Sequence, residues 1–265
     1  MLNSLLDIFR HRILIVTFAR RILKMRFLAS ALGVFLIIAT PIMLLIVYTF
    51  VFGFIFKPQW EVLTEKNVSY VLFLFTGLTV YWIFAEIINS APGTIRSQAA
   101  LVKKVRFPVH ILPVVLNVTA LVNWAVNFSL LMIAMAILKQ GIGWTIILAP
   151  LALIPVVLFT IGLGWILTAT GTYFRDVAQA AGVLNLAGLF LSAIFFPVTA
   201  LPEKFQIFFY FNPVSVSIEA LRSFVLYGEV YDWKIYLTGC AVGVLFMMIG
   251  LFIFQRVRGG FADVL

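Results

Sequence analysis

The fold is decided by a stretch near the C-terminal end, from Thr172 to Gly228: TYFRDVAQAAGVLNLAGLFLSAIFFPVTALPEKFQIFFYFNPVSVSIEALRSFVLYG. Its first half is apolar from Val177 to Phe196, long enough for a helix that crosses about 30 Å of hydrocarbon. Pro197 and Pro202 then interrupt the run, because proline does not continue a helix. A second apolar run follows, and its course through the membrane decides the topology of the chain.

The second run, from Phe205 to Tyr227, is divided by Pro213 and by the charged residues Glu219 and Arg222. The apolar pieces that remain are shorter than about 15 residues, too short to cross a bilayer easily. Pieces of this length are typical of re-entrant or interfacial helices. We therefore predict external re-entrant helices over residues 197–228, followed by a return span.

The composition places the chain in a membrane. Of 265 residues, 63% are hydrophobic and only 11% are charged, which is more apolar surface than one soluble core buries. The single cysteine, Cys240, excludes a disulfide framework, and no Cys/His spacing suggests a metal. Basic residues scattered through the first 27 residues are not the pattern of a cleavable signal. We expect an all-α, multi-pass protein that binds membrane lipid, no metal and no nucleic acid.

Six apolar stretches are long enough to span the bilayer. They lie at about residues 28–56, 70–88, 109–138, 144–170, 177–196 and 235–254. Four prolines, Pro41, Pro113, Pro150 and Pro155, fall inside or at the ends of these stretches, where membrane helices tolerate them as kinks. The predicted architecture is a six-span transmembrane domain over residues 28–265, preceded by a helix over residues 1–27.

Residues 1–27 predict an amphipathic helix that lies along the membrane interface. One face carries Asn3, Asp7, Arg10, Thr17, Arg20, Arg21 and Lys24, and Leu6, Phe9, Ile13, Val16 and Leu23 lie away from it. A basic helix of this kind sits at the headgroups, with its arginines toward anionic lipid or toward a protein partner. The pattern leaves both alternatives open.

The distribution of charge predicts the orientation. If the segment 197–228 enters and returns, the N-terminal helix, the loop 91–108, the loop around Arg175 and the tail all lie on one side, which holds thirteen of the nineteen Lys/Arg. That side has only three acids, whereas the opposite side has six Lys/Arg and six acids. The positive-inside rule then places both termini in the cytoplasm. A complete crossing would put Arg256 and Arg258 outside, which is the poorer solution.

The loop 91–108 predicts a short cytoplasmic helix. Pro92 and Gly93 make a turn, Thr94 is a capping residue, and Phe107 precedes a proline that ends the helix. A loop that only fixes topology remains an alternative, because its basic residues satisfy the positive-inside rule in either case. A rigid helix between two spans is, in addition, a good lever for a soluble partner.

Five motifs along most of the chain carry a family resemblance. They are KMRFLASALGV from Lys24, LVKKVRFPVHILP from Leu101, YFRDV from Tyr173, FFPVTALPEKFQ from Phe195, and FNP followed by IEALR from Phe211. Together with the order of elements, they resemble the permease subunits of ATP-binding-cassette exporters for cell-surface polysaccharides, those for O-antigen, capsule and teichoic acid.

This resemblance implies a protein of the bacterial inner membrane. It also implies a homodimer of the chain bound to two copies of a separate nucleotide-binding ATPase, and a lipid-linked polysaccharide as substrate. ATP and magnesium would bind to the partner, in agreement with the absence of a G-x-x-x-x-G-K-[ST] motif from this sequence. The chain itself would then be a transporter subunit and not an enzyme. On this interpretation the two cytoplasmic helices transmit the partner's closure through their basic residues: Arg10, Arg21, Arg96, Lys103, Lys104 and Arg106.

The resemblance also implies an external gate over residues 197–228. Its candidate residues are Pro197, Pro202, Asn212, Pro213, Glu219 and Arg222. Glu219 and Arg222 are three residues apart on one helix and are expected to pair.

Aromatic side chains are candidates for the wall of a sugar channel, because sugar rings present flat C–H faces that pack on aromatic rings. We select Tyr48, Phe52 and Phe56, which share one helix face. Phe190 and Phe196 are the candidates from the fifth span. Lipid-facing aromatics are the alternative at each position.

Glu86 is the one acid predicted inside a span, and an intramembrane carboxylate is a candidate functional residue. Its structural alternative is an ion pair with a basic residue at the membrane surface.

Two other functions compete with polysaccharide export: an exporter of drugs or small lipids with the same architecture, and a polytopic enzyme acting on lipid-linked sugars. The enzyme would need a cluster of acids or histidines, and the cytoplasmic loops offer only Asp7, Asp176 and Asp263.

Overall fold

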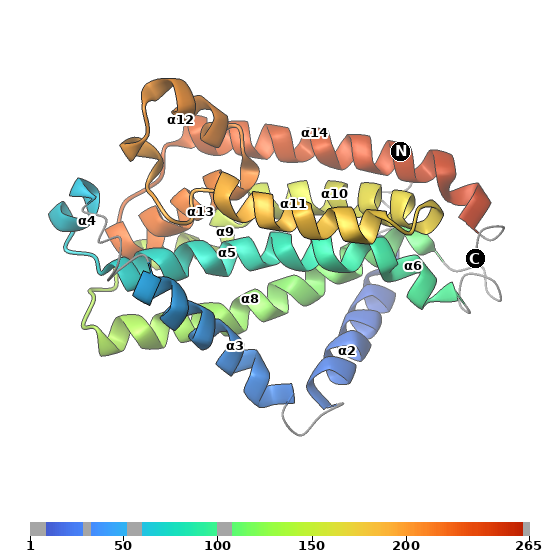
Figure 1. Cartoon of the computed structure of the whole chain (residues 1–265), viewed down its shortest axis with the longest axis horizontal. Helices are drawn as coiled ribbons and strands as arrows, with labels where there is room; N and C mark the ends of the chain where they lie inside the picture. Colours follow the sequence, from blue (N-terminus) through green and yellow to red (C-terminus); the bar gives the residue numbers. More distant parts are fainter. Residues whose placement is uncertain (1–8, 29–32, 52–59, 100–107, 262–265) are drawn as a thin grey trace.

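The computed structural model describes residues 9–28, 33–51, 60–99 and 108–261, and this part of the chain is helical without a strand (Figure 1). The helices are α2 (Arg12–Leu28), α3 (Gly33–Tyr48), α4 (Glu61–Glu65), α5 (Tyr70–Ser90), α6 (Thr94–Ser97), α8 (Leu112–Ile137), α9 (Ala149–Ala152), α10 (Ile154–Tyr173), α11 (Val177–Leu191), α12 (Glu203–Tyr210), α13 (Pro213–Arg222) and α14 (Trp233–Val257). The predicted all-α class is confirmed.

Four helical stretches are long and apolar enough to cross a membrane: Tyr70–Ser97, Val109–Ile137, Trp144–Tyr173 and Trp233–Gly260. They correspond to four of the six predicted spans. The other two predicted spans coincide with shorter apolar helices, Ala39–Val51 in the α3 region and Val177–Leu191. The structure therefore supports a multi-pass bundle with four full-length spans in the described residues.

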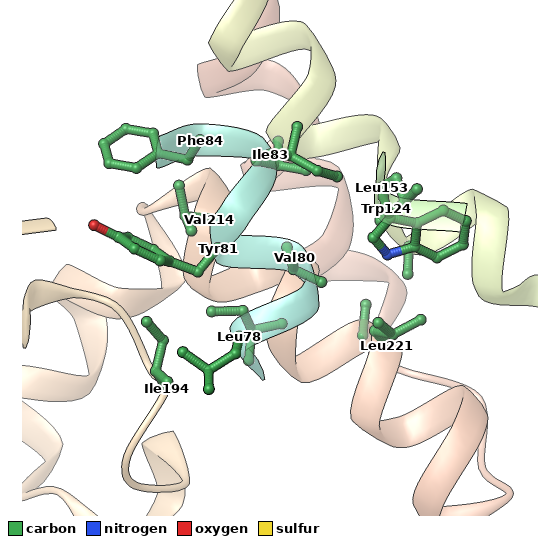
Figure 2. Close-up of a cluster of buried hydrophobic side chains, with 14 of the residues drawn as sticks. Leu78, Val80, Tyr81, Ile83, Phe84, Trp124, Leu153, Ile194, Val214 and Leu221 are labelled. Atoms are coloured by element: carbon green, nitrogen blue, oxygen red, sulfur yellow. The ribbon is translucent and has the colours of Figure 1, made fainter. Parts of the chain in front are cut away.

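Helix α5 lies at the centre of the bundle. Its sequence is apolar all round, and a helix with this pattern is expected to be enclosed by other helices. It packs against α8, α10, α11 and α13, and Leu78, Val80 and Ile83 are at most 1% exposed. Figure 2 shows these side chains surrounded by residues from several other elements.

Helices α10 and α14 form the most extensive helix–helix contact in the described chain. Glycines allow their backbones to approach closely: a Cβ built on Gly250 would lie 2.1 Å from the Gly162 carbonyl oxygen. On Gly243, a Cβ would lie 2.9 Å from the Pro155 carbonyl oxygen. Small residues at such crossings are typical of membrane helices, because dispersion contacts drive their association.

Most of the predicted proline kinks are helix starts. Pro113, Pro150, Pro155 and Pro213 occupy the first turns of α8, α9, α10 and α13, where a missing N–H costs no helical hydrogen bond. Only Pro41 lies inside its helix. The predicted span 144–170 is consequently built from a 3₁₀ turn, α9 and α10 in succession.

The bundle has two distinct ends, visible at opposite sides of Figure 1. Helices α4 and α12 lie at the end called here the α12 end, and α6 lies at the α6 end, beside the last turn of α10. Of the cytoplasmic helix predicted in the loop 91–108, the structure describes α6, which ends at Ser97. Residues 100–107, with Lys103, Lys104 and Arg106, lie outside the described residues.

Helix α2 is attached to the bundle through α8. Its buried residues Ile15 and Ala19 pack against Ile111 and Val115. Phe9, Ile13 and Val16, predicted to lie away from the polar face, are more than half exposed. These side chains do not pack into the bundle, and the predicted interface helix leaves them available to membrane lipid.

Candidate functional site

The predicted re-entrant region forms a helical hairpin made of α12 and α13. Val214, at the start of α13, lies beside Tyr81 and Phe84, midway along α5 (Figure 2). Arg222, at the other end of α13, lies against Phe73 in the first turn of α5. The hairpin therefore turns at the middle of the bundle and returns toward the α12 end without crossing.

The two arms of the hairpin differ in burial. Every residue of α13 except Glu219 is buried, whereas only Phe209 of α12 is buried. In α12, Phe205, Ile207 and Phe208 are 63%, 59% and 55% exposed. One arm is thus part of the core, and the other lies on its surface.

The Arg222 side chain is fully buried and makes hydrogen bonds to two other segments of the chain. Its Nη1 donates to the Ala193 carbonyl at 2.6 Å, and its Nη2 donates to the Ile194 carbonyl at 2.6 Å. Its Nε and Nη2 donate to the Phe73 carbonyl at 3.3 and 3.2 Å. The guanidinium carbon also lies 3.4 Å from the centre of the Phe73 ring, a cation–π contact.

Glu219 completes this site. Its Oε1 accepts a hydrogen bond from Arg222 Nη1 at 2.8 Å, and its side chain is 13% exposed. The predicted pairing is confirmed. A buried charge is costly unless it is paired and hydrogen-bonded, and Arg222 meets both conditions. Gly77 provides the space, since a Cβ there would lie 2.9 Å from Nη2.

Side chains at the start of α13 form hydrogen bonds with the last residue of α11 and with the chain directly after it. Asn212 accepts from the Val214 amide at 3.0 Å, as a helix cap, and donates to the Leu191 carbonyl at 3.1 Å. Ser215 Oγ accepts from the Ala193 amide at 3.2 Å. Thus Asn212, predicted as a gate residue, is a structural cap that also ties the hairpin turn to α11.

The remaining predicted gate residues are prolines with different surroundings. Pro197 is buried and precedes the 3₁₀ turn Val198–Ala200, and Pro202 is exposed directly before α12. Pro213 is buried in the first turn of α13.

Three of the predicted channel aromatics, Tyr48, Phe190 and Phe196, lie in the described residues and contact other aromatic rings. Phe195 joins two of them: its ring centre lies 5.7 Å from that of Tyr48 and 5.6 Å from that of Phe190. Phe196 instead packs edge-to-face on Phe209 of α12, at 5.4 Å. The structure therefore brings Tyr48 and Phe190 together through Phe195, which sequence reasoning missed. Phe52 and Phe56 lie outside the described residues.

Glu86 ties α5 to two other helices. Its Oε1 accepts from Arg26 of α2 at 2.9 Å, and its Oε2 accepts from Asn123 of α8 at 2.7 Å. Thr119 of α8 donates to Oε1 at 3.4 Å. The structural alternative predicted for Glu86, an ion pair with a basic residue, is confirmed. Asn123 was missed, although a polar residue inside an apolar run is a recognisable signal.

The described coupling candidates fall into two groups. Arg10 and Arg21 are exposed on the N-terminal segment. Arg96, in α6, donates from Nη2 to the Thr172 carbonyl at 2.9 Å, which ties α6 to the end of α10. Arg96 therefore has a structural contact of its own.

Tyrosines near the hairpin remain neutral. Burial, the largest cause, raises the pKa of Tyr227 and Tyr231 well above the ordinary value, and the nearby Glu219 carboxylate raises both further. Arg222 opposes this shift at Tyr227. Both hydroxyls therefore stay protonated at physiological pH.

Polar side chains in the described bundle mainly tie helices together. Within residues 9–28, 33–51, 60–99 and 108–261, no group of three or more His, Cys, Asp or Glu side chains could hold a metal ion. The described residues thus form a bundle of apolar helices joined by glycine crossings and buried polar contacts, with a hairpin that turns at mid-bundle.

Comparison with known proteins identifies the class. Residues 14–226 match the ABC-2 type transporter family, so the chain belongs to that family. It is 23% identical to the O-antigen export system permease protein RfbA of Myxococcus xanthus, across 99% of both chains. Identity to the Klebsiella pneumoniae protein of the same name is 24% across 95% of both. The polysialic acid transport protein KpsM of Escherichia coli is 24% identical, over 80% of this chain and 81% of that protein.

Proposed function

We propose that the chain is the transmembrane subunit of an ABC exporter that moves a lipid-linked cell-surface polysaccharide across the cytoplasmic membrane. The observation that carries this proposal is the end-to-end similarity to O-antigen export permeases, which covers the hairpin as well as the spans. A separate ATPase would bind ATP and magnesium and drive export.

The proposed topology has six spans, with α3 and α11 completing the four longer helices. The charge distribution supports both termini and α6 in the cytoplasm, and the α12 end outside. The hairpin then lies on the external side, where it would close or line the exit of the channel. Because it turns at mid-bundle, the next span starts from the same side, as the charge balance requires.

Two regions of the α6 end are proposed to receive the ATPase. Helix α2 presents exposed basic residues, including Arg20, Arg21 and Lys24, and its Arg26 is joined to Glu86 of the central helix. Arg96 joins α6 to the end of α10. A push on either helix would therefore reach the spans through direct polar contacts.

A homodimer is proposed to enclose the path of the polysaccharide. Helix α11 has one buried residue, Ala181, and packs chiefly on α5. Its outer face carries Val183, Leu186 and Phe190, each more than half exposed. A second copy facing this side would place two sets of the Tyr48–Phe195–Phe190 cluster around one channel.

The test is reconstitution with the cognate ATPase. The permease and ATPase genes are deleted together from the host, and surface polysaccharide is measured after complementation with both genes. We expect surface polysaccharide to return, and to be absent when the ATPase cannot hydrolyse ATP. In proteoliposomes, the lipid-linked polysaccharide should stimulate hydrolysis. The proposal fails if drugs or small lipids stimulate ATP hydrolysis and the polysaccharide does not. It also fails if complementation restores no surface polysaccharide.

A further inference from the structure

The two arms of the hairpin are attached to the bundle in different ways. We propose that Arg222 is a positioning residue that joins α13, the chain after α11 and the start of α5 into one unit, and that opening of the exit is a movement of α12 alone. This inference rests on the proposed export function and assigns roles within the hairpin that the family resemblance leaves undivided.

The first step of the argument is what Arg222 satisfies. Helix α11 ends at Leu191, so the carbonyls of Ala193 and Ile194 have no helical partners. Both accept short hydrogen bonds from the Arg222 guanidinium. Removing the guanidinium would leave buried carbonyls unpaired and Glu219 without its counter-ion, which is costlier than the bonds alone suggest.

The second step is that Arg222 does not act alone on α13. Ser217 Oγ accepts from the Val156 amide of α10 at 3.0 Å. Thr145 donates to the Phe224 carbonyl, directly after α13, at 2.6 Å. Together with Ser215 and Asn212, these contacts attach α13 to α10, to the chain before α9 and to the end of α11. An outward movement of α13 would break all of them at once.

The third step is the contrast with α12, whose side-chain hydrogen bonds are local. Gln206 donates to the Leu201 carbonyl at 2.8 Å, and Tyr210 donates to Gln206 at 3.0 Å. Neither bond reaches a span. The buried contact of α12 is Phe209, which shares a small hydrophobic cluster with Ala193 and Val198 and packs on Phe196. Movement of this helix would open that small cluster and leave the main core in place.

The space beside the hairpin turn borders both arms. A recess of about 390 Å³ is lined by Phe208 of α12, by Pro213 and Val214 of α13 and by Val242 and Phe246 of α14. The arms differ there in burial, because Pro213 and Val214 are buried whereas Phe208 is 55% exposed. Since packed interiors resist displacement, the exposed arm is the one expected to move.

Cysteine pairs in a Cys240→Ala background test the division directly. The pair Ala193→Cys/Ser215→Cys would bond the fixed arm to the chain after α11, and Val198→Cys/Phe209→Cys would bond α12 to that chain. In the permease–ATPase complex, we expect oxidation of the first pair to leave export unchanged. Oxidation of the second should stop export, and a reductant should restore it. Loss of export on oxidising the first pair, or continued export with the second pair oxidised, would overturn the inference.

Arg222→Lys tests the positioning role, because lysine keeps the charge and loses the planar fork. Each charge-assisted bond that is lost shifts the equilibrium between attached and detached hairpin by about tenfold or more. We expect export to fall about tenfold while the amount of folded complex is unchanged. Oxidised Ala193→Cys/Ser215→Cys should rescue export in this variant, since it replaces the same attachment. A purely structural role would lower the amount of folded complex and give no such rescue, and that result would refute the positioning role.

Labelling separates this inference from the proposed function, because it needs no polysaccharide. Single cysteines at Ile207 in α12 and at Ser217 in α13 are treated with a membrane-impermeant maleimide, in the nucleotide-free complex and after trapping with ATP and vanadate. We expect labelling of Ile207→Cys to change with nucleotide and that of Ser217→Cys to stay low. If this holds in a complex that exports no polysaccharide, the proposed function fails and the inference stands. If Ser217→Cys changes, or neither does, the inference fails whatever the substrate.

Discussion

Replacing Gly250 with alanine is expected to force α14 away from α10. The added Cβ would lie 2.1 Å from the carbonyl oxygen of Gly162, and a Cβ on Gly162 would lie 2.3 Å from the carbonyl oxygen of Phe246. Carbon–oxygen contacts between packed backbones are ordinarily about 3.3–3.6 Å. The two backbones must therefore separate by roughly 1 Å, because no side chain can move aside to relieve the contact.

The expected cost follows from two opposing terms. Overpacking a close contact costs about 1–3 kcal/mol, and a backbone-to-backbone clash belongs near the upper value. The higher helix propensity of alanine stabilises the folded variant by about 1 kcal/mol. The net destabilisation is about 2 kcal/mol, which corresponds to a fall of about 4–8 °C in the melting temperature of a chain of this size.

Thermal unfolding of the purified protein in nanodiscs measures this change. Gly182→Ala is the matched control: Gly182 lies in α11, and a Cβ there meets nothing within 4 Å, so the melting temperature should hold or rise. The double variant Gly162→Ala/Gly250→Ala should cost less than the sum of the single variants, because one separation relieves both clashes. Equal melting temperatures for Gly250→Ala and Gly182→Ala would refute the close crossing.

Three further predictions concern polar ties, each measured by thermal unfolding. Glu86→Ala should cost about 2 kcal/mol because Asn123 loses a charged acceptor, Glu86→Gln should cost less, and exposed Glu65→Ala should change nothing measurable. Asn212→Ala should cost about 1–2 kcal/mol by removing a helix cap, and Asn212→Asp should recover the cap but not the bond to α11. Tyr81→Phe should cost about 1 kcal/mol, because the hydroxyl donates to Asn185 of α11 at 2.7 Å. A wild-type melting temperature for any of these variants except Glu65→Ala would contradict the corresponding contact.

The helical membrane class and the hairpin could be predicted from the sequence because both depend on local patterns. Apolar runs of sufficient length predict spans whatever their partners are. The interruption at Pro213 and the three-residue spacing of Glu219 and Arg222 are also local. Apolar patterning predicted the length of α11 less well, because this helix ends at Leu191, before the predicted end of the span at Phe196.

The partners of Arg222 could not be predicted in this way. Phe73 is 149 residues away in the sequence, and nothing in its local pattern distinguishes its carbonyl from others in α5. The carbonyls of Ala193 and Ile194 become acceptors only because α11 stops early. Phe195 likewise reads as one aromatic among many until Tyr48 and Phe190 are seen on either side of it.

Two ion pairs, Arg222–Glu219 and Arg26–Glu86, bear on the charge argument for the proposed orientation. Arg222 and Glu219 neutralise each other inside the bundle and should not be counted as external loop charges. Without them, the proposed external side holds five Lys/Arg and five acids in place of six of each, so its balance remains zero. The Arg26–Glu86 pair removes one cation from the opposite side, which leaves twelve of the original thirteen against three acids. The asymmetry thus depends on exposed residues near the span ends, which are the charges that the positive-inside rule concerns.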